Sequence, residues 1–285
     1  MIGSIVHLSD THFGGEADLS MIVAIENLIP DLEPTATVVS GDLTVRARHG
    51  ELQAAAAFVR ELERTAPVVV IPGNHDVQWW WRPLLPFSAA LKYRKYCTYF
   101  GPDATPTLSL PEVFIASAVT AHGVAWGSLT LQPRDIAVKG HLPANEIQRV
   151  AELFHQADPA QLRVLVLHHN VLPGELSRRM GLARWKRAQQ RIVESGAELV
   201  LCGHDHQESI GQLGDKVVVS CTGTCSTRSR GDRPSVFHKI GWDAESIQIE
   251  QYRWDGERRR FIRADVYVFA RQSEVHAARV SARAS

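Results

Sequence analysis

Short apolar segments recur along the first two thirds of the chain, and each ends at a cluster of polar residues. These segments cover residues 2–8, 37–40, 68–71, 163–167 and 198–202. They are rich in Val, Ile and Leu and show little alternation with polar residues, which is typical of strands buried on both faces. Helical patterns lie between several of them, at residues 19–28, 49–64, 144–156 and 185–195. This alternation predicts an α/β fold.

The pattern changes after residue 207, where β-rich segments follow one another without helices. They cover residues 216–220, 235–241, 246–253 and 260–269, with Asp255-Gly256 as a hairpin turn. We expect them to form a second, mostly antiparallel sheet. The aromatic and basic insertion at residues 78–100 fits neither pattern. Residues 271–285 are rich in Ala, Arg and Ser and predict a frayed helix or a disordered tail, which leaves one domain over residues 1–270.

The five early segments end in side chains that suit a hard metal ion. In chain order these are Asp10 and His12, Asp42, Asn74, the His pair at 168–169, and His204 with His206. Because ligands bind at the carboxyl ends of strands in such sheets, the five ends are expected to converge. Gly41 permits close approach of the backbone at the second end. Asp42, which follows it, therefore suits a carboxylate placed between two ions.

Together the five blocks resemble the calcineurin-like metallophosphoesterases, whose blocks read D-x-H, G-D, G-N-H-[DE], H and G-H-x-H. Here they read DTH, GD, GNHD, H and GHDH, between residues 10 and 206. The resemblance implies a four-layer α-β-β-α sandwich with two mixed β-sheets. It also implies two divalent or mixed-valence metal ions, for which Mn, Fe and Zn all accept oxygen and imidazole ligands.

The family pattern distributes seven ligands over the two ions. One ion would take Asp10, His12, Asp42 and His206, and the other Asp42, Asn74, His168 and His204. His168 is chosen over His169 because the family's ligand directly follows the strand. The resemblance implies that a hydroxide shared by the ions attacks phosphorus in line, with catalytic roles for Asp42, Asn74 and His75. His75 would bind a phosphoryl oxygen or protonate the leaving group, and a purely structural hydrogen bond is the alternative.

Three segments are most similar to bacterial class III cyclic-nucleotide phosphodiesterases. They are HLSDTHFG, GDLTVRARHGE, and GNHDV with the aromatic-rich insertion after it. Val45 departs from that pattern, because those enzymes often carry an acidic residue there that would orient His75. Two further residues are candidate substrate contacts. Trp79 could stack a base and Arg230 could bind a phosphate, while packing of the insertion and simple solvation are the alternatives.

Composition limits the partners. Lys plus Arg and Asp plus Glu each number 31, so no net charge favours a nucleic acid polymer. No apolar run approaches the ~18 residues of a membrane span, and the N-terminus lacks a signal-peptide pattern. The four cysteines are too scattered for a disulfide scaffold. We expect a cytoplasmic protein with a small phosphoester substrate, no transmembrane segment and the possibility of a homo-oligomer.

Several functions are compatible with this cluster. The leading hypothesis is an enzyme that hydrolyses a small phosphodiester, with a 3′,5′-cyclic nucleotide as the named candidate. A phosphomonoesterase or a nucleotide-lipid pyrophosphatase would use the same residues. A non-catalytic metal-binding scaffold is the alternative from another class, although such proteins typically lose metal ligands and this chain keeps all seven.

Overall fold

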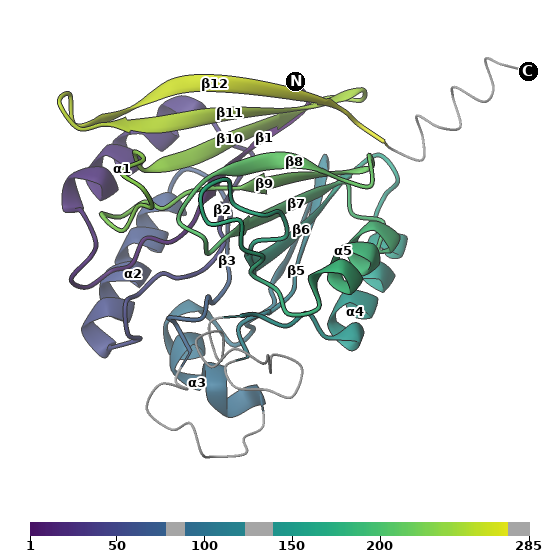
Figure 1. Cartoon of the computed structure of the whole chain (residues 1–285), viewed down its shortest axis with the longest axis horizontal. Coiled ribbons are helices and arrows are strands. Elements are labelled where there is room, and N and C mark those ends of the chain that lie inside the picture. Colours follow the sequence, from purple (N-terminus) through teal and green to yellow (C-terminus); the bar gives the residue numbers. More distant parts are fainter. Residues whose placement is uncertain (78–88, 123–138, 273–285) are drawn as a thin grey trace, which may run out of the picture.

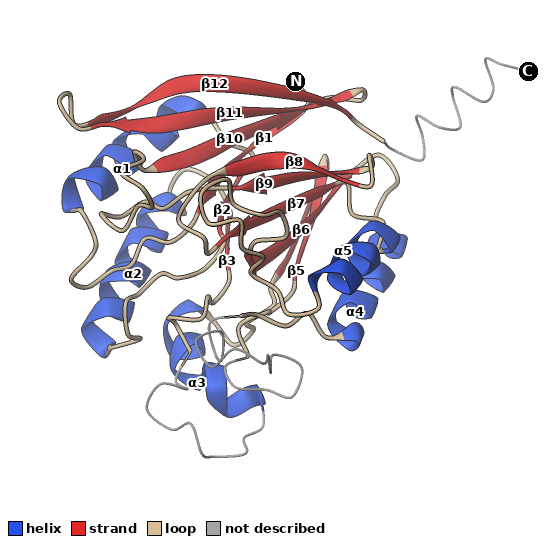
Figure 2. Ribbon diagram, in the orientation of Figure 1, coloured by secondary structure: helices blue, strands red, loops and turns tan. Residues whose placement is uncertain are grey.

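The computed structural model describes residues 1–77, 89–122 and 139–272. Two six-stranded sheets pack face to face, and helices cover both outer faces (Figure 1, Figure 2). One helical layer holds α1 (Leu19–Leu32) and α2 (His49–Leu62), and the other holds α4 (Ala144–Gln156) and α5 (Trp185–Glu194). This arrangement confirms the predicted α-β-β-α sandwich with two mixed sheets.

The first sheet has the order β12-β11-β10-β1-β2-β3. Its strands are β1 (Gly3–Leu8), β2 (Ala36–Val39), β3 (Val68–Val70), β10 (Val236–Trp242), β11 (Ser246–Asp255) and β12 (Arg260–Ala270). The second sheet has the order β4-β5-β6-β7-β9-β8. Its strands are β4 (Thr107–Leu110), β5 (Val113–Ser117), β6 (Leu162–His169), β7 (Leu199–Gly203), β8 (Ser209–Leu213) and β9 (Val217–Cys221).

The strands after residue 207 do not form a sheet of their own, so that prediction was wrong. β10 pairs antiparallel with β1, and β11 and β12 continue outward from it. β9 instead pairs parallel with β7, and β8 follows at the edge of the second sheet. The parallel strands of each sheet leave unpaired backbone N–H and C=O groups at one edge. The late strands form hydrogen bonds with these groups, β10 in the first sheet and β9 in the second. The short strands β4, β5 and β8 were not predicted from the sequence. Residues of β4 alternate between exposed and half-buried, and β8 is half-buried except at its last residue.

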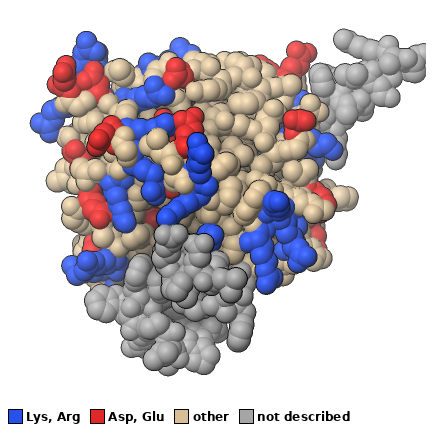
Figure 3. All heavy atoms as spheres, in the orientation of Figure 1, with Lys and Arg blue, Asp and Glu red and all other residues tan. Residues whose placement is uncertain are grey.

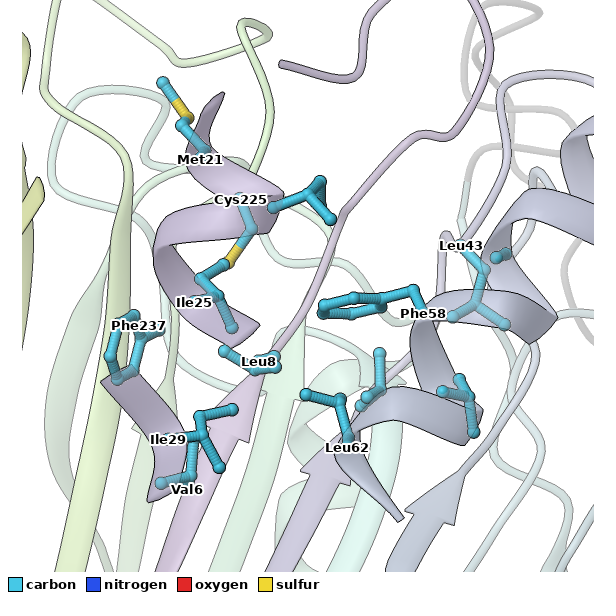
Figure 4. Packing of buried hydrophobic residues seen from close by; sticks show 14 of the residues in the cluster. Val6, Leu8, Met21, Ile25, Ile29, Leu43, Phe58, Leu62, Cys225 and Phe237 are labelled. Carbon is cyan, nitrogen blue, oxygen red and sulfur yellow. The ribbon is translucent and has the colours of Figure 1, made fainter. Parts of the chain in front are cut away.

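β1 shows why the early strands read as continuous apolar runs. Ile5 points into the cluster between the two sheets, whereas Val6 and Leu8 point into the cluster beneath α1 and α2. In Figure 4, Val6 and Leu8 face Ile29 and Ile25 of α1. Each such side chain contributes about 1.5–3 kcal/mol when it is fully buried. Because both faces of the strand are buried, the alternation of polar and apolar residues is lost.

One helix is longer than predicted, and another was not predicted from the sequence. α1 continues to Leu32, past Pro30, because Ile29 and Leu32 are buried against the sheet and Glu33 closes the helix in a left-handed conformation. Within the insertion, α3 (Ala89–Phe100) is helical, and Tyr96 donates a hydrogen bond to the carbonyl of Val70 at 3.0 Å. No described helix is both long enough and apolar enough to cross a bilayer.

The end of β12 is anchored to the second sheet by a buried ion pair. Arg271 is 4% exposed, and its Nε lies 2.9 Å from Oε1 of Glu198. The same guanidinium donates to the carbonyl of Gln161 at 3.0 Å. Glu198 also accepts from the backbone N–H of Arg163 at 3.1 Å. Charges buried in this way require partners, so the contact fixes where the first sheet ends against the second.

A buried polar chain crosses the apolar space between the sheets. Nδ1 of His7 lies 3.0 Å from Oγ of Ser220, and that oxygen lies 2.8 Å from Nδ1 of His238. Nε2 of His7 lies 2.9 Å from Oγ of Ser40. All four side chains are fully buried. Burial, assisted by the charge of Arg253, lowers the pKa of His238 to about 3, so this imidazole is neutral in the folded protein.

This buried histidine predicts a loss of stability in mild acid. An unfolded chain protonates His238 near pH 6.5, whereas the folded chain does so only near pH 3. The unfolded state therefore binds more protons in this window, and the free energy of unfolding falls as the pH drops from 6.5 towards 3. In urea titrations at pH 7.5 and 5.5, His238→Gln is expected to lose less stability than the wild type. The exposed control His155→Gln should retain the wild-type dependence, and an equal slope in all three would contradict the assignment.

Candidate metal centre

The loops that follow β1, β2, β3 and β7 meet the last residues of β6 at the carboxyl ends of these strands, as the sequence predicts. Backbone hydrogen bonds join the first two loops, from Asp10 N to Gly41 O at 3.0 Å and from His12 N to Asp42 O at 3.1 Å. The N–H of His204 donates to Oδ2 of Asp10 at 3.0 Å, which joins the loop after β7 to the same place. Residues far apart in sequence are thus brought into one small volume.

Two groups of side chains have the geometry of ion sites. Ligand atoms of the first group all lie within 4.8 Å of one another, and its members are Asp10, His12, Asp42 and His206. The second group meets the same criterion, and its members are Asp42, His168 and His204. Oδ1 of Asn74 lies 3.2 Å from Nε2 of His168 and 3.0 Å from Nδ1 of His204. Asp42 belongs to both groups, so one carboxylate reaches two adjacent sites.

Backbone strain is concentrated at these residues. Five members of the two groups have positive φ angles, namely Asp10 (55°), His12 (46°), Asp42 (50°), His204 (76°) and His206 (55°). Residues other than glycine rarely adopt this region, and each instance costs on the order of 1–3 kcal/mol. Such strain persists only where the surrounding structure enforces it. Here it turns side chains from separate loops towards a common point.

Three glycines allow the loops to approach one another. A Cβ at Gly73 would overlap the carboxylate of Asp42, and a Cβ at Gly203 would overlap Ser9 and the carboxylate of Asp10. Gly41 has a φ of 100°, and a Cβ there would also press on His168. The close approach expected at Gly41 from the sequence is therefore present in the structure.

The electrostatics of the site fit a bound cation. Asp10 and Asp42 are 0% and 1% exposed, yet their pKa values lie well below the ordinary range. Burial by itself would raise both pKa values, but neighbouring imidazoles outweigh it, chiefly His12 and His206 for Asp10 and His168 for Asp42. In the described part of the chain neither carboxylate forms an ion pair with Lys or Arg. Two buried negative charges therefore favour a positive ion between them.

The nitrogen ligands differ in charge. Burial alone would lower the pKa of His168, but the Asp42 carboxylate outweighs it and raises that pKa to about 9. Burial lowers the pKa of His204 to about 3, which leaves its imidazole in the neutral form that binds metal ions. Within the described residues, the buried Oδ1 of Asp10 makes no well-formed hydrogen bond and meets only imidazole nitrogens, the nearer being Nε2 of His206 at 3.1 Å. Buried polar atoms of this kind are rare unless a further partner is present. The residues present thus fit a pair of metal ions.

His75 is oriented by a backbone group. Its Nδ1 lies 2.7 Å from the carbonyl oxygen of Val45, and its own N–H donates to Oδ1 of Asp42 at 2.8 Å. The His75 ring lies edge-on to that of His12, with 5.1 Å between centroids. The sequence indicated that Val45 deprives His75 of an orienting carboxylate. The structure shows that the carbonyl of the same residue accepts the hydrogen bond instead.

Asp76 connects two loops of the site, a role that sequence reasoning missed. Its fully buried carboxylate accepts hydrogen bonds from the N–H groups of Leu43, Thr44 and Gly73 at 2.9–3.0 Å and from the Thr44 hydroxyl at 2.8 Å. Burial, together with the nearby charge of Asp42, raises the pKa of Asp76 to about 6. The final residue of the GNHD block was the available signal, but no spacing rule indicates which backbone groups it binds.

Other candidate residues are not members of the two ion groups. Nδ1 of His169 lies 2.8 Å from the Thr120 hydroxyl, and the His169 ring packs on His204 with 4.4 Å between centroids. Arg230 is held by Asp205, with its Nε 3.0 Å from the Asp205 carbonyl and an ion pair of 3.3 Å to the carboxylate. This contact supports the loop between His204 and His206. Trp79 lies outside the described residues.

Comparison with known proteins identifies the family. The calcineurin-like phosphoesterase family matches residues 3–208, which include all five blocks of candidate ligands. A comparison with curated proteins gave no match.

Three solved structures have a similar fold. A dimetal phosphatase from Danio rerio is 10% identical, covers 94% of this chain and 99% of its own, and aligns with a TM-score of 0.65. A purple acid phosphatase from yellow lupin (Lupinus luteus) seeds is 13% identical over 94% of this chain and 54% of its own, with a TM-score of 0.66. The anchor protein of the Plasmodium inner membrane complex is 10% identical over 98% and 93%, with a TM-score of 0.56. At these identities the likeness shows a common fold, and the match over residues 3–208 shows that the chain belongs to the calcineurin-like phosphoesterase family.

Proposed function

We propose that this protein hydrolyses a small phosphodiester with the help of two metal ions. The observation that carries this proposal is the place of Asp42, whose carboxylate belongs to both ligand groups. A carboxylate shared in this way holds two ions close enough to act on one phosphoryl group. Membership of a phosphoesterase family supports the reaction class, and the balance of 31 basic and 31 acidic residues supports a small substrate over a nucleic acid polymer.

The two groups divide the proposed ligands between the ions. We infer that one ion is held by Asp10, His12, Asp42 and His206, and the other by Asp42, Asn74, His168 and His204. When bound, such ions lower the pKa of a water molecule and neutralise charge on the phosphoryl oxygens. The donor set of carboxylate, amide and imidazole suits Mn, Fe or Zn.

His75 is the proposed acid for the leaving group. A carbonyl oxygen can only accept a hydrogen bond, so the contact with Val45 places a hydrogen on Nδ1 of His75. Nε2 is then the nitrogen that exchanges a proton, as a general acid requires. The backbone N–H of His75 donates a hydrogen bond to Oδ1 of Asp42, which fixes the main chain of His75 beside the residue shared by the two ion groups. We propose that the His75 imidazolium protonates the leaving alkoxide.

A substrate panel tests the preference for diesters. With manganese-loaded protein whose metal content is measured on the same sample, kcat/KM for bis(p-nitrophenyl) phosphate is expected to exceed that for p-nitrophenyl phosphate. The reverse order would contradict the diesterase proposal and favour a phosphomonoesterase. Hydrolysis of 3′,5′-cyclic AMP in the same panel tests the cyclic-nucleotide assignment, and single-stranded DNA is expected to remain intact.

The domain organisation and the cellular location of the protein are also proposals. We propose that residues 1–270 form one domain with the insertion at 78–100. We also propose that the protein acts in the cytoplasm.

A further inference from the structure

A basic pocket of about 200 Å³ lies between α5 and the start of α4, outside the metal centre. The charged residues that line it are Arg184, Arg187 and Arg191. His141 and Ala144, close to the start of α4, also line it. Figure 3 shows Lys and Arg side chains gathered over α5. The volume is below the ~300–1,000 Å³ of typical small-molecule pockets, so it suits a compact group rather than a nucleoside.

The three arginines have no anionic partner within the described part of the chain. Arg184 precedes α5, and Arg187 and Arg191 follow at spacings of three and four residues, which places them along one face of the helix. Like charges at a spacing of four destabilise a helix by a few tenths of a kcal/mol. The arrangement therefore assembles positive charge that no described acidic side chain balances through an ion pair.

Two further features of α5 oppose its intrinsic preferences. Lys186 and Arg187 lie in its first turn, where the helix dipole favours acidic residues. Arg184 at the N-cap has a φ of 51° and makes no side-chain cap hydrogen bond. Local conflicts of this kind are concentrated at functional sites, because selection retains them where a ligand compensates.

The side of the pocket that the start of α4 forms is also suited to an anion. α4 begins at Ala144 after Pro143, which provides no side-chain hydrogen bond to the first N–H groups of the helix. Such N–H groups and the positive end of the helix dipole attract phosphate and carboxylate groups. Burial and the charges of Arg184 and Arg191 also lower the pKa of His141, which indicates a positive potential within the pocket.

A chain of contacts through two short segments connects the pocket to the metal centre. The N–H of Ala183 donates to the carbonyl of Gly140 at 2.9 Å, and Gly140 in turn donates to Gly181 at 2.9 Å. Gly140 packs so closely on the His169 ring that a Cβ there would overlap it. His141 therefore follows a residue that contacts His169, and His169 itself packs on His204, whereas Arg184 follows a residue that is hydrogen-bonded to Gly140.

We propose that this pocket binds a phosphate group at a second site, separate from the phosphoryl group that reacts. The anion is either a further phosphate of the substrate, an assignment that rests on the proposed function, or free inorganic phosphate. Two arginine forks and uncapped N–H groups match the oxygen atoms of a phosphate.

Matched substrates test the first source. The thymidine dinucleotides TpT and pTpT share one phosphodiester and differ by a 5′-phosphate. The wild type is expected to have a KM for pTpT about 10-fold or more below that for TpT, the effect of a hydrogen bond to a charged group. The variant with both Arg187→Gln and Arg191→Gln should lose this ratio. Lys186→Gln removes a charge from the same helix but lies outside the pocket wall, and it should retain the ratio.

Titration with inorganic phosphate tests the second source. By calorimetry, metal-loaded wild type and Lys186→Gln are expected to bind one more phosphate than the double arginine variant, whose fold is checked by circular dichroism. Either the KM ratio or the extra binding site supports the pocket, and each identifies its source. The proposal is overturned if the arginine variant matches the wild type in both experiments. Absence of any TpT hydrolysis by the wild type would instead refute the proposed function, and the phosphate titration would still test the pocket.

Discussion

Replacing Asp42 by Asn is expected to lower hydrolysis of bis(p-nitrophenyl) phosphate by about 10³-fold or more. The substitution removes the negative charge shared by the two ligand groups while it preserves the shape of the side chain. Removal of one fixed electrostatic partner at a reacting centre commonly lowers kcat by about 10²–10³-fold. A shared ligand affects both ions at once, so the loss should lie at or beyond the upper end of that range. The measurement is kcat/KM in the presence of manganese, with bound metal determined in parallel.

The matched control is Asp265→Asn, which removes an exposed carboxylate from β12 without touching the site. This variant should keep wild-type activity and metal content. The hydrogen bond from His75 N–H to Oδ1 of Asp42 can persist with the Asn side chain, so the loop is expected to remain folded. Wild-type rates in Asp42→Asn would reject the catalytic interpretation of the cluster.

Gly73→Ala is expected to reduce activity by about 10²-fold through displacement of Asp42. The added Cβ would overlap the Asp42 carboxylate and the Asp42 backbone nitrogen, and neither is the far end of a flexible side chain. Misplacement of a catalytic group by about 1 Å can lower the rate 10²-fold. The variant introduces no charge and removes no functional group, so it separates the geometry of the site from its composition. Bound metal should fall together with kcat/KM.

Gly15→Ala provides the control for this substitution. No atom lies within 4 Å of a Cβ built at Gly15, so the same chemical change should leave activity and metal binding intact. Equal activity in Gly73→Ala and Gly15→Ala would show that Asp42 need not hold the position seen in the structure.

The parts of the fold that depend on local pattern could be predicted from the sequence. The helix at residues 144–156 has the predicted bounds, and β1 begins one residue after its predicted start. The five groups of polar residues converge because each lies at the end of a strand, and the end of the apolar run marks where that strand ends. The partners of the late strands could not be predicted, because β10 and β9 have similar apolar patterns. Their assignment to different sheets depends on long-range pairing with β1 and β7.

Within the site, the sequence indicated which side chains could bind metal ions. It did not indicate which backbone groups would form hydrogen bonds with the side chains of the site. Asp42 and His204 are visible in the sequence as ligand types at strand ends. The carbonyl of Val45 is available at any residue, and only the path of the loop brings it to 2.7 Å from His75. Asp76 was visible as a carboxylate, but its four hydrogen bonds go to groups on two loops that the sequence does not place together. α1 likewise passes Pro30 because burial of Leu32 outweighs the local preference to end.

A crystal of the protein grown with manganese and measured for anomalous scattering tests the central claim most directly. Two manganese peaks are expected, with Asp42 in contact with both. One peak should contact Asp10, His12 and His206, and the other Asn74, His168 and His204. A single peak, or peaks that leave Asp42 without contact to one of the ions, would contradict a two-metal centre built around this carboxylate.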